Sequence, residues 1–141
     1  GAYGVMNSAG RSGEGYFVSY RDPNLKETDQ VFEGVADYLE QFDADERDMT
    51  KYVIGTISDM DTPLLPPYKG AKAVSAWYSG ITDEMLAEER RQVLAAQPED
   101  IRALAKIIRA ILSTGSFCVV GNSEKIKENK ELFGSIKNLF N

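Results

Sequence analysis

The sequence contains no histidine and a single cysteine among 141 residues. Zinc sites in proteins are built mainly from histidine and cysteine, so this chain cannot form one by itself. Serine and cysteine hydrolases need a base that is usually histidine, and no Gly-x-Ser-x-Gly motif is present. A hydrolase with paired carboxylates is not excluded by residue type, but no spacing favours one. The sequence therefore shows no recognisable catalytic centre, and we expect no metal and no cofactor in this chain.

Other features are equally scarce. The lone Cys118 excludes an intrachain disulfide, and its place in the apolar run Phe117–Val120 predicts a buried thiol. No apolar run approaches the length of a membrane span, and no secretory leader opens the chain, so we expect no membrane partner and an intracellular, cytoplasmic location. Acidic side chains outnumber basic ones by 22 to 16, for a net charge of −6, which gives no reason to expect binding to nucleic acid.

What is present is typical of a globular protein. The apolar fraction is 43%, with seven tyrosines and six phenylalanines. A chain of this length fits one domain, so we expect a single domain over residues 1–141. The sequence begins at Gly1, without methionine and directly in a strand-like pattern, and we expect it to be part of a larger protein.

The first 20 residues predict a β-hairpin. Residues 3–7 and 15–20 carry aromatic and β-branched residues, and the segment between them is rich in glycine and serine. Its glycines are followed by a strand rather than by a helix or a Lys-Ser/Thr pair, which argues against a phosphate-binding loop.

Helical patterns occupy most of the remaining chain. Asn24 with Glu27, and Asp43 with Glu46, predict the caps of two helices, while Thr82 and Pro98 predict the starts of two more. The prolines between Asp61 and Pro67 predict a break, and Gly80 predicts the end of a helix over 69–79. The apolar stripes of these helices comprise Leu25, Phe32, Val35, Leu39 and Phe42; Met49, Val53, Thr56 and Met60; Val74, Trp77 and Tyr78; and Ile101, Leu104, Ile108 and Ile111 or Leu112.

Residues 117–120 predict a short buried strand, and the tail from Ser123 a final helix. The order of elements predicts an α+β fold, with a small antiparallel or mixed sheet and about six helices packed on one of its faces. Three strands leave exposed edges, so we expect a homodimer formed through such an edge.

Two acidic pairs invite a metal site, Asp43 with Asp45 and Asp59 with Asp61. A calcium loop needs alternating oxygen ligands, a glycine and a distal glutamate, which neither segment supplies. Capping and helix-end roles explain these aspartates better.

Five segments resemble the C-terminal part of the insulinase/pitrilysin-type zinc metallopeptidases, in the branch of the presequence proteases. They follow one another in the order found in that family and span most of the chain: Gly1–Gly4, Tyr20–Asn24, Thr50–Asp59, Pro98–Leu104 and Cys118–Asn122. The resemblance implies a partial peptidase-type domain. The family's His-x-x-Glu-His zinc motif belongs to another domain and has no counterpart here.

The resemblance also assigns a role to Tyr3. Without it, Tyr3 is best explained as a strand aromatic packed on a helix. In the family, a tyrosine in a Gly-Ala-Tyr-Gly stretch pairs with an arginine a few residues upstream, before Gly1 in this numbering, and hydrogen-bonds the substrate backbone. Tyr3 matches that tyrosine and is the substrate-binding residue that we expect.

The resemblance implies that this chain is a non-catalytic C-terminal part of a zinc metalloendopeptidase that degrades unfolded peptides. In these enzymes two halves enclose a chamber in which peptides are degraded. This chain would close that chamber, bind the N-terminal half of the same polypeptide, which carries the zinc, and help to hold an unfolded peptide. The alternative is a non-catalytic interaction or assembly module of the same superfamily.

Overall fold

The computed structural model describes residues 2–139 and divides into two compact units. One unit combines residues up to Gln41 with those from Ala103 onward, and the other runs from Phe42 to Arg102. The α+β class is confirmed, because a two-stranded antiparallel sheet is joined by helices along most of the chain. The single domain stays a prediction.

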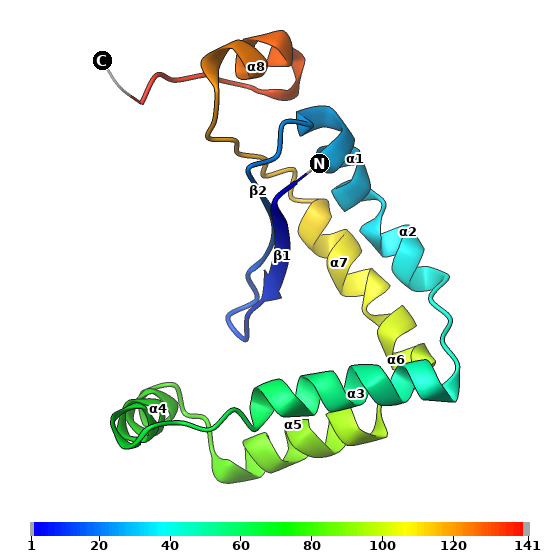
Figure 1. The fold of residues 1–141 in the computed structure, drawn as a ribbon, viewed down its shortest axis with the longest axis vertical. Coiled ribbons are helices and arrows are strands. Elements are labelled where there is room, and N and C mark those ends of the chain that lie inside the picture. The colour runs from blue at the N-terminus through cyan, green and yellow to red at the C-terminus, as the bar shows by residue number, and fades with distance from the viewer. Residues whose placement is uncertain (1, 140–141) are drawn as a thin grey trace. The chain divides into compact units, whose positions relative to one another are not determined.

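The first unit begins with the predicted hairpin (Figure 1). Strand β1 (Gly4–Ala9) pairs with β2 (Gly15–Tyr20), with Gly4 opposite Tyr20 and Ala9 opposite Gly15. Phe17 and Ser19 are half-buried, whereas Tyr16, Val18 and Tyr20 are exposed, as the alternation of a strand requires. Gly15 permits close packing on α7, because a Cβ there would lie 2.4 Å from the Ile111 Cδ1 atom.

Three helices complete the packed part of this unit. Helix α2 (Val35–Glu40) packs against α7 (Ala105–Leu112), while α1 (Leu25–Glu33) contributes Phe32, whose ring centroid lies 5.5 Å from that of Phe17. The small residues Ala36 and Ala105 are 1% and 2% exposed. Arg109 on α7 also donates to Asp37 at 2.9 Å and pairs with Glu40 at 2.5 Å, which raises the pKa of its guanidinium.

The cap at Asn24 and the apolar stripe that ends at Phe42 predict one continuous helix, and this prediction is wrong. The helix is interrupted at Gly34, where α1 ends and α2 begins, although the apolar stripe is half-buried as predicted. The helix that starts at Pro98 is likewise divided at Leu104, into α6 (Pro98–Ala103) and α7. Leu104, expected in the buried stripe, is exposed, and Ala105 is buried instead.

Of the two predicted caps, one has the expected position without the expected hydrogen bond, and the other is wrong. Asn24 precedes α1 but its side chain makes no capping bond, whereas the Asp22 carboxylate accepts from the Asn24 N–H at 3.0 Å and from the Thr28 hydroxyl at 2.5 Å. The cap of α3 (Glu46–Met60) is Asp45 rather than Asp43, because Asp45 accepts from the Asp48 N–H at 2.8 Å.

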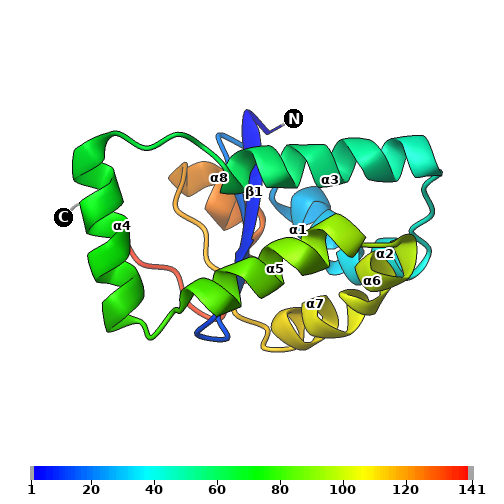
Figure 2. The same ribbon diagram turned by 90° about the horizontal axis from the view of Figure 1, so that it is seen from below.

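The second unit consists of α3, α4 (Pro66–Tyr78), α5 (Asp83–Ala95) and most of α6. Helices α3 and α5 pack against each other, and Arg90 on α5 forms a bidentate pair with Asp61 after α3. Helix α4 runs across the end of this pair (Figure 2). It begins at Pro66 rather than at the predicted Lys69, because prolines are tolerated in the first turn of a helix.

The ends of α4 and α5 otherwise follow the predictions. Gly80 has a φ of +65° and closes α4, with the Gly80 N–H donating to Trp77 and the Ile81 N–H donating to Ala76. Thr82 caps α5 by accepting from the Met85 N–H at 3.3 Å. Finally, the Arg102 guanidinium donates to the Phe42 carbonyl at 2.7 Å, which ties together the first and last residues of this unit.

The predicted strand at residues 117–120 is absent. This segment has an extended path, but none of its backbone groups hydrogen-bonds to another described residue. The chain then continues into α8 (Ser123–Glu128), capped by Asn122, and a short 3₁₀ helix (Lys130–Leu132). A strand needs a neighbour for its N–H and C=O groups, and no described strand lies beside this segment.

Candidate functional site

Tyr3 lies immediately before β1, at the open end of the hairpin. Its backbone N–H donates to the Tyr20 carbonyl at 2.9 Å, which extends the strand pairing by one residue. The Tyr3 side chain is 78% exposed, so it is not packed on a helix. Its phenol is therefore free to meet another molecule.

The Tyr3 ring contacts two residues from the end of β2. It stands edge-on to Tyr20, with centroids 6.1 Å apart, and the Arg21 guanidinium carbon lies 5.7 Å from the Tyr3 centroid and 5.3 Å from the Tyr20 centroid. Both distances fall within the range of a cation–π interaction. The three side chains form one cluster at the end of the hairpin.

The outward face of the hairpin continues from this cluster. Met6 lies opposite Val18 in the pairing, and Tyr16 and Tyr20 lie on the same face as these two. All four side chains are exposed. We call these four residues the tyrosine face, an apolar surface with phenol groups that no described element covers.

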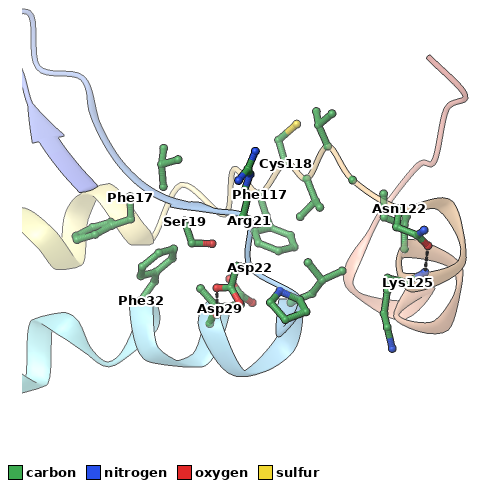
Figure 3. A pocket seen from close by; sticks show the side chains of 18 of the residues that line it. Phe17, Ser19, Arg21, Asp22, Asp29, Phe32, Phe117, Cys118, Asn122 and Lys125 are labelled. Atoms are coloured by element: carbon green, nitrogen blue, oxygen red, sulfur yellow. Dashed lines mark hydrogen bonds between the residues drawn. The ribbon is translucent and has the colours of Figure 1, made fainter. Parts of the chain in front are cut away.

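A pocket of about 620 Å³ lies in the same unit, between the end of β2, the start of α1 and the extended segment 116–122 (Figure 3). Phe17 and Phe32 face each other at one end of the view, and Arg21, Phe117 and Cys118 also line the pocket. The polar groups of the wall include Ser19, Asp22, Asp29 and Lys125. Hydrogen bonds from Thr28 and Asn24 lower the pKa of the Asp22 carboxyl.

Cys118 is exposed, which contradicts the prediction of a buried thiol. The reason is the missing strand: without a neighbouring strand, the run 117–120 has nothing to bury its second face. Phe117 is held only on one side, where its ring stacks on Phe133 with centroids 5.5 Å apart.

Two of the four aspartates considered as metal ligands, Asp45 and Asp61, have other partners. Asp45 caps α3, and the hydrogen bond from Arg90 lowers the pKa of Asp61. No group of three or more histidine, cysteine, aspartate or glutamate residues within 2–139 is placed to hold a metal ion. The described part of the chain does not fit a zinc site.

A family model described as the PreP C-terminal domain matches residues 1–124. The chain belongs to the PreP C-terminal domain family. The match includes Tyr3, the hairpin, and the pocket wall as far as Asn122. It also confirms the resemblance to presequence proteases over most of the chain.

Several curated relatives are similar over nearly the whole chain. Protein HypA of Clostridium perfringens is 47% identical over 139 residues, which are 99% of this chain and 14% of the relative. Presequence protease 1, chloroplastic/mitochondrial, of Arabidopsis thaliana is 35% identical over 89% of this chain and 12% of the relative. The mitochondrial presequence protease of Xenopus tropicalis is 30% identical over 86% of this chain and 12% of the relative. The chain thus spans a small part of the length of these PreP relatives.

The sequence pattern does not identify Arg21 as a member of this cluster. Arg21 lies within the family-like segment Tyr20–Asn24, but nothing in the pattern distinguishes it from a solvent-exposed arginine after a strand. Its φ of +51° and its place over two rings are visible only in three dimensions.

No helix in the described part of the chain has the length and apolarity needed to cross a bilayer.

Proposed function

We propose that this chain acts as a non-catalytic C-terminal module of a zinc-dependent metalloendopeptidase that degrades unfolded peptides. The observation that carries the proposal is the family match over residues 1–124, together with relatives that are presequence proteases. Because this chain has no histidine, we propose that the zinc is bound by the N-terminal half of the same polypeptide.

The module would contribute to substrate binding through Tyr3. An exposed phenol can donate a hydrogen bond to a peptide carbonyl and can stabilise the negative charge that grows on its oxygen. The adjoining tyrosine face offers an apolar surface of the kind that accommodates an extended peptide, and β1 has an edge to which such a peptide could pair.

The module would also close the chamber against the N-terminal half. Large exposed apolar residues support this role, because soluble domains seldom expose so many without a partner. On α4 they include Tyr68, Trp77 and Tyr78, the last two 75% and 79% exposed. We also propose a bacterial cytoplasm as the location of the parent protein; the relative with 47% identity supports its bacterial source.

The test is Tyr3→Phe in the intact polypeptide, with peptide cleavage as the readout. We expect kcat/KM to fall by about 100-fold, because one donor to the developing oxyanion is lost. Tyr38→Phe is the matched control, since Tyr38 is also exposed but lies on α2. Equal rates for Tyr3→Phe and the unmodified protein, with both folded, would eliminate the role of Tyr3.

The second candidate is a non-catalytic interaction or assembly module, which the absence of histidine equally favours. The parent reading frame distinguishes the two. An N-terminal His-x-x-Glu-His motif supports the peptidase, and its absence supports the assembly module.

A further inference from the structure

Arg21 has a strained backbone. Its φ of +51° makes it the only residue other than glycine with a positive φ in the described part of the chain. For a residue with a Cβ, this conformation is unfavourable and persists only where the surroundings impose it. Strain of this kind concentrates at sites where a side chain must point in one direction.

The strain at Arg21 is imposed from both sides. On one side, the Tyr20 carbonyl accepts from the Tyr3 N–H and holds the end of the hairpin closed. On the other, the Asp22 carboxylate accepts from the Asn24 N–H and the Thr28 hydroxyl and holds the start of α1. Arg21 joins these two anchored points, which fixes the direction in which its side chain leaves the backbone.

The Arg21 side chain also differs from several other arginines in what it contacts. Arg90, Arg91, Arg102 and Arg109 all pair with carboxylates. The guanidinium of Arg21 pairs with no carboxylate within residues 2–139 and instead lies against the rings of Tyr3 and Tyr20. Its charge is therefore not neutralised by a described carboxylate.

We propose that Arg21 is a positioning residue for Tyr3, an inference that rests on the proposed function. The guanidinium holds the Tyr3 ring in one orientation from its place beside both rings. Its positive charge also favours the negative charge that develops on a peptide carbonyl when the Tyr3 hydroxyl donates to it. Tyr20 completes the arrangement as the second ring that fixes Arg21.

The test measures peptide cleavage by the intact polypeptide with Arg21→Asn and Arg21→Lys. Asparagine tolerates a positive φ, so Arg21→Asn removes the charge while keeping the backbone conformation. Lysine retains the charge. Arg47→Gln, which removes an exposed charge from α3, is the matched control.

We expect Arg21→Asn to lower kcat about 10-fold with little change in KM, and Arg21→Lys to restore most of the rate. In a Tyr3→Phe background, Arg21→Asn should have no further effect, because the hydroxyl through which it acts is gone. Thermal unfolding of each variant confirms that the hairpin is intact.

The outcomes separate the two proposals. If Tyr3→Phe slows peptide cleavage and Arg21→Asn does not, the role of Arg21 is overturned and the proposed function stands. Additive losses in the double variant overturn it as well, because Arg21 would then act independently of Tyr3. An unaffected Tyr3→Phe enzyme overturns the role of Tyr3, and the role of Arg21 with it.

Discussion

Asp22 shows how much a single side chain contributes at the end of β2. Its carboxylate accepts from both the Asn24 N–H and the Thr28 hydroxyl, and so links the N-cap residue of α1 to the helix, whereas the Asn24 side chain makes no capping bond. Capping depends on which oxygen the turn brings near the free N–H groups, and spacing alone does not decide between neighbouring candidates. The same reasoning explains why Asp45, and not Asp43, caps α3.

We predict that Asp22→Ala lowers the free energy of unfolding by about 1 kcal/mol near neutral pH. The pKa of the folded carboxyl lies below its usual value of 3.8. Its contribution is therefore present above that usual value and is lost as the pH falls through the lowered pKa. Urea unfolding should show a large difference between the proteins at neutral pH and a smaller one in strong acid.

Asp29→Ala is the control for this experiment. Asp29 lies on α1, the helix that follows Asp22, but its carboxylate forms no hydrogen bond with another described residue. A pH-independent loss in Asp22→Ala, or an equal loss in Asp29→Ala, contradicts the stabilising role of these two hydrogen bonds.

Among the helices, the sequence predicts a start or an end best where a residue has one dominant backbone preference. Gly80 ends α4 and Pro98 starts α6, because a positive φ and a fixed φ are properties of those residues themselves. The breaks at Gly34 and Leu104 were missed because they depend on how successive short helices pack around Ala36 and Ala105.

Helix α4 offers a matched pair of substitutions. Gly80→Ala should lower the free energy of unfolding by about 1 kcal/mol, because its φ of +65° is unfavourable for alanine. Gly70→Ala should raise it by up to about 1 kcal/mol, since Gly70 is inside the helix and a Cβ there meets nothing within 4 Å. Chemical denaturation measures both. Changes of the same sign in the two variants are incompatible with this account.

At the scale of the whole molecule, little apolar surface is fully buried. The buried hydrophobic residues in the described part of the chain are Ala36, Met49 and Ala105, while many large side chains are exposed. Exposed apolar surface of this extent supports the proposal that the chain packs against other polypeptide. This agrees with a chain that spans 12–14% of the length of the relatives described above.

We predict that the 141-residue chain dimerises in isolation through the free edge of β1, which pairs only with β2 among the described strands. Val5→Lys should favour the monomer, because a charge on an edge strand opposes further pairing. Ser12→Lys adds the same charge in the turn and should leave the dimer intact. Light scattering at several concentrations measures the mass. A monomer at every concentration excludes the dimer.

The sequence by itself determined the α+β class, the hairpin and the family, because these depend on local preferences and on motifs that persist in short segments; the role of Tyr3 stays a prediction. Only the tertiary structure decided that residues 117–120 do not form a strand, that Cys118 is exposed, and that Arg21 lies over Tyr3 and Tyr20. Each of these depends on a neighbour brought close by folding: a strand needs a partner for its backbone, and a guanidinium needs a ring within reach.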